Sequence, residues 1–566
     1  MKRALLIMYL IIVVLMPTVA KATGILYRGD DPLVVQVERL LVQTGTPLPS
    51  FASPISANHL LNQLEKIDQQ KLKEWDLIQF KRLQKELTEG PLKRYNSLLA
   101  LEAGIRLAPE FYLHTNSDEE LTEREWFFNQ KLRDNFLTFY GEATINDNFH
   151  LVYNHPYHRK RRGWLSPTEE TAFVGGFNHN IVFTDSLMDH SVPHSAFLGF
   201  SNNLFTFAIG RDSLNIGRGS TGNLLLGDHL DYHDFIRFSI YGGPISYSFS
   251  ATKYSLINQD GIASGISFYD PFRIYVTHTM EMQLFKKFRM AISESALFLA
   301  THFDIRMFSP LMFLHNYYNS SSSDDFIDRG MYNDTNNFVS FNLEWNIMPN
   351  LFLYGEIGLD QVQLGGEMSN LSNPPNAYGA LLGFRFAKGI TGGSLYGLIE
   401  GVYTSPYLYL RGNEEGAGDV DFQGAGWNLA LVGASNNPWE SSGVGYIGYK
   451  YGPDTIVGAF KIGYDRYNSY DLLFNLELRL HGERGLKAHG KNQNLDTLSD
   501  YSPYSPSGVI EWCLQSGIGV KAKFFNALEA HTQINYLHRW NFRNIPNQTF
   551  SDIQIVVGLS YALKIF

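Results

Sequence analysis

The chain has little of three things that would point to other protein classes. It contains one cysteine, Cys513, in 566 residues, so it can form neither an internal disulfide nor a cysteine-based metal site. After residue 22 it has no run of 18 apolar residues, which excludes a membrane-spanning helix there. Charged residues are only 18% of the chain, and acidic residues outnumber basic ones by 56 to 46. That balance argues against nucleic acid as a partner.

The N-terminus has the layout of a secretory signal peptide. Lys2 and Arg3 precede an apolar run at residues 5–16, and Ala20 and Ala22 flank Lys21 in a small-x-small cleavage site. A membrane anchor is the alternative, but the run is shorter than the roughly 20 residues that a spanning helix needs. We predict a cleaved signal peptide at residues 1–22, whose removal makes the exported chain more acidic.

Aromatic residues and glycine are abundant. Aromatics make up 14% of the chain, with 32 Tyr and 40 Phe, and there are 50 Gly, while the mean hydropathy is −0.17. This is too polar for a helical membrane protein. It is typical of outer-membrane β-barrels, where lipid-facing apolar residues alternate with polar lumenal ones and aromatics girdle both interfaces.

Residues 23–97 carry apolar residues at helical spacing. We predict a small periplasmic bundle of about three helices, with Ser56 as an N-cap and Gly90 as a stop. A flexible linker is the alternative, which the regular spacing disfavours. The apolar positions are Leu33, Val37, Leu40 and Leu41, then Leu60, Leu61, Leu64 and Ile67, and then Leu77, Phe80, Leu83 and Leu87.

From about residue 99 the period changes to two. Phe341, Leu343 and Trp345 share one face of a predicted strand, and Glu344 between them lies on the other face. A turn at residues 348–350 follows, after which apolar and polar residues alternate again over Leu351–Asp360. We predict an antiparallel barrel over residues 98–566, mostly β, with about 16–18 strands and an apolar outside. A soluble sandwich also alternates. Tight turns that alternate with long polar connections, at residues 365–376, 405–424 and 482–507, favour the membrane barrel.

The last strand predicts the orientation of the barrel. It runs through alternating apolar residues to Phe566 and resembles the assembly signal that the barrel-assembly machinery of outer membranes recognises, although the lipid-facing register passes through Ile565. If the C-terminus is periplasmic, the turns near residues 526, 349 and 243 are periplasmic as well. The connections after residues 360, 404 and 540 then face outward.

The densest polar segment, residues 210–234, does not fit a phosphate loop because no lysine follows its glycines. Its acidic and histidine residues could bind a divalent metal, but we interpret the segment as a solvated loop and predict no metal and no cofactor. No catalytic motif stands out, so we predict that the chain is not an enzyme; Glu344 and Glu356 suit a lumen better than glycoside cleavage. The potential ligands are Asp228, His229, Asp231, His233 and Asp234.

A basic loop lies on the predicted outer side. Arg159, Lys160, Arg161 and Arg162 precede Trp164. Arginine binds anionic groups through two hydrogen bonds at once, so the loop could contact lipopolysaccharide phosphates or an acidic glycan. An ordinary charged loop is an equally good interpretation.

The sequence resembles the Wzi-type capsule-assembly outer-membrane proteins over most of the mature chain, including the helical segment. Where that family commonly has a tryptophan and Gly-Pro-Gly, this chain has Asn215 and Gly217-Arg218-Gly219. The resemblance is carried by Gly210-Arg211, Gly217-Arg218-Gly219 and Leu224-Leu225-Leu226, by Ser293-Glu294, by Ser309-Pro310-Leu311 and His315-Asn316, and by Leu353-Tyr354-Gly355-Glu356 with Asp360.

The resemblance implies a barrel of about 18 strands that acts as a surface lectin, holding exported capsular polysaccharide or exopolysaccharide without hydrolysing it. Sugar binding needs aromatic faces and fixed polar groups, although each aromatic could instead belong to an interfacial girdle. The binding candidates are Tyr157, Trp164, Tyr317, Tyr318 and Tyr407, with Arg211, Asp228 and His229 as polar partners. The rival is a porin-like channel whose lumen Glu344, Glu356, Asp360 and Glu529 would line, favouring cations.

Overall fold

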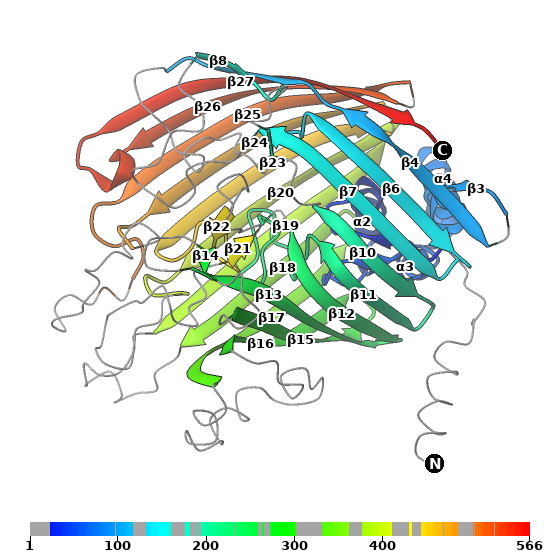
Figure 1. Ribbon diagram of the computed structural model, residues 1–566, viewed down its shortest axis with the longest axis horizontal. Coiled ribbons are helices and arrows are strands. Elements are labelled where there is room, and N and C mark those ends of the chain that lie inside the picture. Colours follow the sequence, from blue (N-terminus) through cyan, green and yellow to red (C-terminus); the bar gives the residue numbers. More distant parts are fainter. Residues whose placement is uncertain are drawn as a thin grey trace, which may run out of the picture.

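A computed structural model describes most of the chain (Figure 1). The signal peptide predicted at residues 1–22, the basic loop from Lys160 to Trp164, and Asp231, Tyr317 and Tyr318 lie outside the described residues. The described residues are 23–96, 98–116, 132–159, 176–181, 188–189, 194–230, 232–257, 263–264, 272–300, 331–361, 376–409, 430–432, 443–467, 469–484, 502, 504–525 and 527–566.

Eighteen antiparallel strands close into a barrel, which confirms the predicted fold class. The ring closes where the last strand pairs with the first, for example Tyr561 with Leu107. In chain order the strands are β4 Leu99–Leu107, β6 Leu137–Ile145, β7 Phe149–Arg159, β10 Ser195–Ser201, β11 Phe205–Asp212, β12 His233–Gly242, β13 Ile245–Ile257, β15 Phe272–Phe285, β16 Phe288–Ala300, β17 Met331–Met348, β18 Leu351–Gln361, β19 Ala377–Ile390, β20 Gly393–Thr404, β23 Thr455–Arg466, β24 Tyr470–His481, β25 Glu511–Phe524, β26 Leu528–Trp540 and β27 Thr549–Lys564.

Shorter strands lie beside this ring. β5 (Glu110–His114) continues β4 and pairs with both β27 and β8 (Gly176–His179). β1 (Leu26–Tyr27) pairs with β2 (Ile55–Ser56). The remaining short strands are β3 Lys93–Arg94, β9 Met188–Asp189, β14 Ala263–Ser264, β21 Ala430–Val432 and β22 Gly443–Gly445.

The connections sort by length to the two ends of the barrel. Tight turns, including those between β12 and β13, β17 and β18, and β25 and β26, lie at the same end as the C-terminus. The connections after residues 360, 404 and 540 lie at the opposite end, as predicted. We call these the short-turn end, on the right in Figure 1, and the long-loop end. In outer-membrane barrels the short turns face the periplasm.

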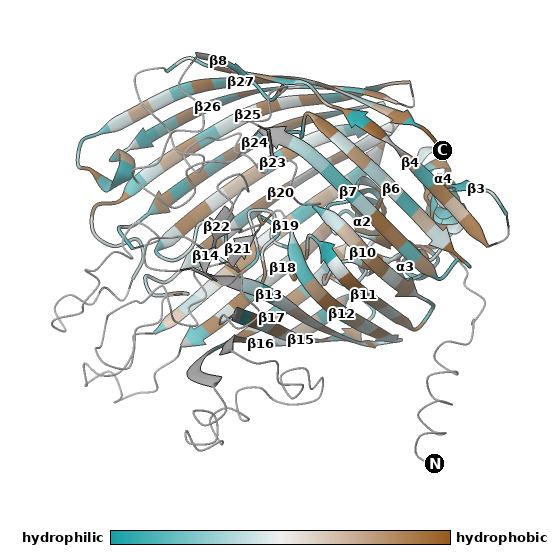
Figure 2. Ribbon diagram, in the orientation of Figure 1, coloured by the Kyte–Doolittle hydropathy of each residue, from teal (hydrophilic) through white to brown (hydrophobic). Residues whose placement is uncertain are grey.

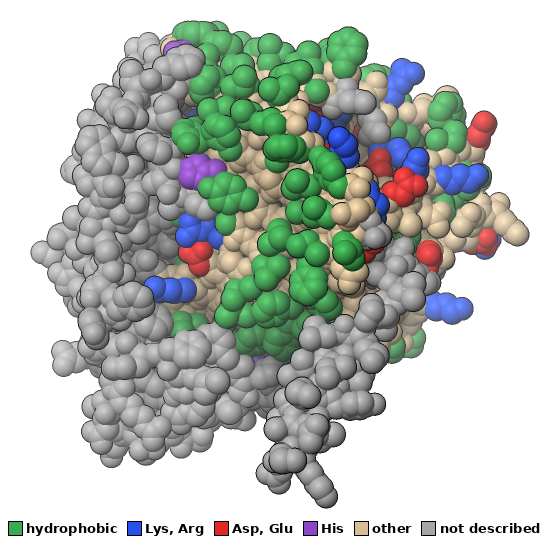
Figure 3. Space-filling view, turned by 45° about the vertical axis from the view of Figure 1, so that its right-hand side comes forward, with side chains coloured by type: hydrophobic (Ala, Val, Ile, Leu, Met, Phe, Trp, Pro, Cys, Tyr) green, Lys and Arg blue, Asp and Glu red, His purple; other side chains and the backbone are tan. Residues whose placement is uncertain are grey.

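The outer face of the barrel is apolar, as the period-two pattern predicts. Phe341 and Trp345 are 41% and 44% exposed, whereas Glu344 between them is 4% exposed and faces inward. Figure 2 shows apolar and polar residues alternating along the strands, and Figure 3 shows hydrophobic side chains gathered on the outer wall. Exposed aromatics lie near both ends, with Phe285 and Tyr561 near the short turns and Trp512 and Trp540 near the long loops. This is the arrangement of a lipid-facing surface.

Three helices precede the barrel, as predicted: α2 (Pro32–Thr44), α3 (Ala57–Leu64) and α4 (Glu74–Glu89). The Ser56 hydroxyl accepts a hydrogen bond from the backbone N–H of His59 at 3.2 Å, and Gly90 ends α4 with a φ of 73°. A single 3₁₀ turn (Gln69–Lys71) lies between α3 and α4. In the described part of the chain, no helix is long and apolar enough to cross a membrane.

The helical part, residues 23–90, closes the short-turn end of the barrel, and we call it the helical plug. The N–H of Asn350 in the β17–β18 turn donates to Val42 at the end of α2, at 2.9 Å. Arg39 forms an ion pair with Asp465 of β23 at 2.8 Å. Val34, Val37 and Leu41 are almost fully buried. Figure 1 shows α2 and α3 within the outline of the barrel.

Candidate functional site

The connection between β11 and β12 folds back into the lumen, and we call residues 213–230 the inserted segment. Leu224, Leu225 and Leu226 are 0% exposed, and fully burying a side chain of this size stabilises by roughly 1.5–3 kcal/mol. Our interpretation of this segment as a solvated loop was therefore wrong for most of it. Three consecutive leucines are the sequence signal of insertion, because they need an apolar environment.

Two carboxylates of the barrel wall accept hydrogen bonds from the backbone of the inserted segment. Glu356 of β18 accepts from the N–H groups of Leu224 and Leu225 at 2.9 and 3.1 Å. Glu400 of β20 accepts from the N–H groups of Ser220 and Thr221 at 2.7 and 2.8 Å. A buried backbone N–H without a partner is costly, and a carboxylate is a strong acceptor. These two side chains therefore let a loop enter the barrel.

The glycines of the inserted segment permit close backbone approach. A Cβ on Gly219 would lie 1.9 Å from the carbonyl oxygen of Gly222, and Gly217 has a φ of 132°, which L side chains rarely adopt. The Gly217-Arg218-Gly219 pattern thus has a local structural cause.

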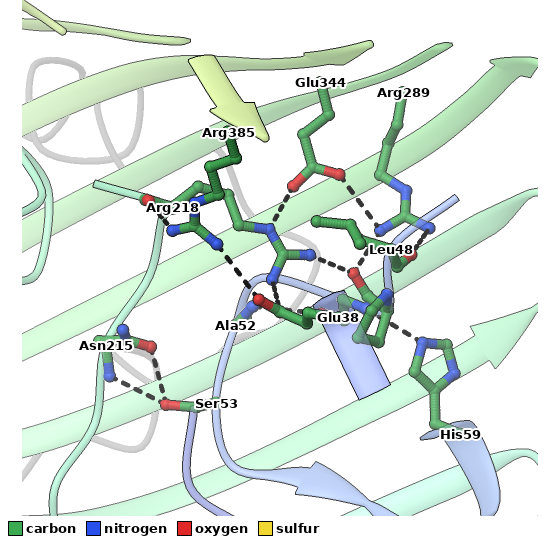
Figure 4. Close-up of polar contacts among 12 residues, drawn as sticks. Glu38, Leu48, Ala52, Ser53, His59, Asn215, Arg218, Arg289, Glu344 and Arg385 are labelled. Atoms are coloured by element: carbon green, nitrogen blue, oxygen red, sulfur yellow. Dashed lines mark hydrogen bonds and ion pairs between the residues drawn. The ribbon is translucent and has the colours of Figure 1, made fainter. Parts of the chain in front are cut away.

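Arg218 joins the inserted segment to both the helical plug and the barrel wall (Figure 4). Its Nε lies 2.6 Å from Oε1 of Glu344 on β17, and its other nitrogens contact Glu38 of α2 and the carbonyl oxygen of Pro49. Arg385 of β19 also pairs with Glu38, at 3.2 Å. Burial lowers the pKa of Arg218, but Glu344 and Glu38 outweigh that effect and raise it. The guanidinium therefore stays charged.

Two further wall arginines bind the segment between α2 and α3. Arg289 of β16 donates to the carbonyl oxygens of Leu48 and Pro49 at 2.7 and 2.6 Å. Arg237 of β12 donates to those of Ala52 and Pro54 at 2.7 and 2.5 Å. An arginine offers five donors in a fixed geometry, so this irregular stretch of backbone is held without regular secondary structure.

A layer of tyrosines lies on the long-loop side of the inserted segment. The hydroxyl of Tyr409 donates to the carbonyl oxygen of Leu224 at 2.6 Å and accepts from the N–H of Tyr449 at 2.9 Å. Asp360 of β18 accepts from the N–H of Tyr409 at 3.0 Å. Both tyrosines are 0% exposed. The helical plug, the inserted segment and this layer fill the lumen next to β10–β20 in succession.

The opposite part of the lumen is more polar. Glu102 of β4, Glu142 of β6, Lys461 of β23 and Asn475 of β24 point inward and are half-buried. Lys461 donates to the Ser220 hydroxyl at 2.8 Å and so reaches the inserted segment. This part of the wall therefore keeps solvent-accessible polar groups beside the filled part.

The predicted sugar-binding residues lie in different environments. Tyr157 is on the outer face of β7 with its ring 5.3 Å from that of Phe139, the position of an interfacial aromatic. Arg211 pairs with Asp234 at 2.7 Å and lies 4.1 Å over the ring of Tyr232. The candidates Trp164, Tyr317 and Tyr318 lie outside the described residues.

The structure places the other three candidates close to the tyrosine layer. Asp228 is exposed and His229 half-buried, directly after Gly227, whose N–H donates to Ile447 at 3.0 Å. Tyr407 is only 6% exposed; its hydroxyl accepts from the N–H of Ser502, and Arg484 lies 4.7 Å over its ring. These residues belong to one polar and aromatic layer at the long-loop side.

Three of the four predicted lumen-lining carboxylates bind the inserted segment or the tyrosine layer. Glu344 pairs with Arg218, Glu356 binds the inserted segment, and Asp360 binds the tyrosine layer. Glu529 instead pairs with Lys521 and Lys523 at 2.9 and 3.0 Å near the short-turn end. Four further contact residues were not predicted from the sequence: Glu400, Arg218, Arg237 and Arg289. An inward-facing charge on a strand was the only sequence signal for three of these.

One group of potential metal ligands is present among the described residues, and it is not the one considered from sequence. Glu110, Asp134 and His531 bring their ligand atoms within 4.8 Å of one another. Glu110 already contacts His531 at 2.8 Å, and Asp134 pairs with Arg106 at 3.0 Å. In the predicted group, His233 accepts from the N–H of Leu214 and Asp234 pairs with Arg211.

The architecture defines a class, a closed 18-strand antiparallel barrel with an apolar outer face and a lumen filled along β10–β20. No protein-family model and no curated protein matches the chain. Among solved structures it is similar to Wzi of Escherichia coli, described as an outer-membrane protein involved in group 1 capsule assembly and a carbohydrate-binding β-barrel. That similarity has a TM-score of 0.55 at 13% identity and covers 94% of this chain and 98% of that one.

Porin-type barrels are more distant. OpdQ of Pseudomonas aeruginosa matches with a TM-score of 0.37 and 8% identity over 82% of this chain and 98% of that one. OprD of the same organism matches with a TM-score of 0.35 and 5% identity over 84% of this chain and 98% of that one. The likeness to Wzi shows that the chain has the fold of outer-membrane β-barrels, and membership of the Wzi-type family stays a prediction.

Proposed function

We propose that this chain is an exported outer-membrane β-barrel that binds polysaccharide at the cell surface and holds it there without hydrolysing it. The filled lumen is the observation that carries the proposal. A helical plug, an inserted segment and a tyrosine layer occupy the space that a solute would cross, and their contact residues, such as Leu224 and Tyr409, are 0% exposed. Ion pairs and hydrogen bonds to the wall hold all three in place.

The same observation disfavours a porin-like channel. A conducting pore needs a water-filled path lined by groups that bind solutes weakly. Glu344, Glu356 and Asp360 would have lined such a path, but their oxygens are engaged by protein groups. The likeness to Wzi adds the fold, and the carbohydrate binding in the description of that protein agrees with the proposal without extending to this chain.

The polar and aromatic layer at the long-loop side supplies suitable chemistry for glycan binding. The exposed Asp228 and the half-buried His229 offer hydrogen-bonding groups for sugar hydroxyls. Arg211 lies at the same end of β11. In the proposed orientation this end faces the outside of the cell, where an exported polysaccharide would be met.

The test compares cells with the gene, without it, and with it restored. Polysaccharide bound to the cells is measured against polysaccharide released into the medium, with total synthesis as the control. We expect loss of the gene to move polysaccharide into the medium at constant total. An unchanged partition between cells and medium would contradict the proposal. A restored Asp228→Ala/His229→Ala variant should then retain less polysaccharide than the wild type at equal amounts of folded barrel.

A further inference from the structure

The short-turn end contains a second concave site, separate from the tyrosine layer. A cavity of about 880 Å³ lies between the helical plug and the rim of short turns, within the size range of small-molecule sites. Its walls are the end of α2, the stretch between α3 and α4, and the turns that join β12 to β13, β15 to β16, and β17 to β18. It therefore opens on the side opposite to the candidate glycan surface.

The lining of this cavity is basic, although the chain as a whole is acidic. It includes seven cationic side chains and three carboxylates, whereas the whole chain has a net charge of −10. The cationic side chains are Lys66, Lys71, Lys73, Lys286, Lys287, Lys388 and Arg289. A concave wall with charges of one sign concentrates ions of the opposite sign, so this cavity attracts anions.

The three carboxylates of the cavity balance only part of its positive charge. Asp68 pairs with Lys71 at 3.0 Å, and Glu281 contacts Arg289 at 3.4 Å. Burial raises the pKa of Asp76, and the charge of nearby Lys73 offsets part of that effect. Within the described part of the chain, the remaining lysines form no ion pair with a carboxylate; these are Lys66, Lys73, Lys286, Lys287 and Lys388. Burial lowers the pKa of Lys66, and the neighbouring Arg289 lowers it further.

Neutral hydrogen-bonding groups lie between the cations. They are Gln43, Thr44, Thr46, Gln63, Ser246, Gln283 and Asn350. Hydroxyl and amide groups bind sugar hydroxyls, and ammonium groups bind carboxylates and phosphates. The cavity is walled by six separate stretches of the chain, so it suits a small or chain-like ligand better than the surface of a folded protein.

We propose that this cavity binds the acidic sugars of an exported glycan, through carboxylate or phosphate groups held by Lys286, Lys287 and Lys388. The inference rests on the proposed function, because that function brings a polysaccharide to the barrel. It adds that the glycan is acidic and that the periplasmic face of the barrel also contacts it. Inorganic phosphate shares the anionic chemistry and is the alternative occupant.

The test measures binding of tetragalacturonate to the purified full-length protein in neutral detergent, with maltotetraose as the uncharged probe. The triple variant Lys286→Gln/Lys287→Gln/Lys388→Gln removes three exposed charges from the cavity. Lys81→Gln/Lys85→Gln/Lys93→Gln is the matched control, because those exposed lysines lie on α4 and β3 outside the cavity. We expect tetragalacturonate to bind, the cavity variant to bind at least about tenfold more weakly, the control variant to match the wild type, and added salt to weaken binding.

Equal binding by both variants, or no binding of tetragalacturonate, would overturn the inference. Inorganic phosphate that binds more tightly than tetragalacturonate would also overturn it and assign the cavity to a free anion. The proposed function is tested separately by retention of polysaccharide on cells. If retention depends on the gene while both lysine variants bind alike, only the cavity fails. If binding depends on the cavity while retention is unchanged, the proposed surface function fails.

Discussion

Arg218 of the inserted segment and Glu344 of β17 form a buried ion pair, with Nε and Oε1 separated by 2.6 Å. The two residues are 126 positions apart in the sequence, and each has one further charged partner. Arg218 also contacts Glu38, and Glu344 also faces Arg289 at 3.6 Å. This pair therefore couples the helical plug, the inserted segment and the barrel wall.

Removing one member of this pair should loosen the inserted segment. Breaking a buried ion pair costs about 3–5 kcal/mol, whereas replacing both members by apolar residues is often nearly neutral. We expect Glu344→Leu to speed hydrogen exchange at Leu224, Leu225 and Leu226, by the factor that this loss of free energy implies. Arg218→Met/Glu344→Leu should restore most of the protection, since Glu38 keeps Arg385. A double variant that exchanges faster than the single one would contradict the ion-pair account. Heat-dependent mobility on a gel checks that each barrel is folded.

A wall carboxylate should affect protection of the inserted segment only where it binds that segment. Glu400 accepts from two backbone N–H groups, from the Thr221 hydroxyl and from the Tyr354 hydroxyl. Hydrogen bonds to a charged group contribute about 1.5–3 kcal/mol, so we expect Glu400→Gln to reduce protection of residues 220–225 measurably.

Glu529→Gln is the matched control for that substitution. The ion pairs of Glu529 with Lys521 and Lys523 are half-exposed, and such pairs contribute about 0–1 kcal/mol to stability. Equal effects of the two substitutions on residues 220–225 would show that Glu400 does not act through the inserted segment.

The sequence predicted the barrel well because its pattern is local. Phe341 and Trp345 face out and Glu344 faces in, since one residue in two must contact lipid. The helices were predicted for the same reason, from Leu60, Leu64 and similar spacing. Both patterns depend only on neighbours within one element.

The contents of the lumen could not be predicted in the same way. An inward-facing Glu356 suits a water-filled pore as well as an anchor, and its partners at Leu224 and Leu225 lie more than 130 residues earlier. The inserted segment was misassigned because its four glycines and its short polar residues are typical of an exposed loop. Only the structure shows that the carboxylates and arginines facing the lumen have complementary partners far away in the sequence.

Mild acid should weaken the attachment of the plug through His59. Its Nε2 accepts from the N–H of Ser50 at 3.1 Å, and the ring stacks on Tyr241. Burial, with Arg289, Lys66 and Arg218 nearby, lowers the pKa of His59 to about 3. A detached segment would protonate near the ordinary value of 6.5, so this contribution is complete above pH 6.5 and is lost as pH falls from 6.5 towards 3.

The expected loss between pH 7 and pH 5 is about 2 kcal/mol in the opening free energy of residues 48–60, from 1.36 kcal/mol per pH unit. Hydrogen exchange corrected for its intrinsic pH dependence measures it. His59→Gln cannot take up a proton and should remove most of the slope, even if the variant opens more readily at every pH. The same slope in His59→Gln would assign the pH dependence to the neighbouring carboxylates instead.

The filled lumen should block ion conduction, and emptying it should open a pore. In planar bilayers we expect little steady conductance from the wild-type barrel. Deleting residues 24–90 and replacing residues 215–227 by a short Gly-Ser linker removes the helical plug and the inserted segment but leaves every barrel strand intact. That variant should conduct in stable steps, with a cation preference from the exposed Glu344, Glu356 and Glu400. Conductance of the wild type equal to that of the variant would show that the polar part of the lumen, beside Glu102 and Glu142, is an open path, and would favour the channel over the surface lectin.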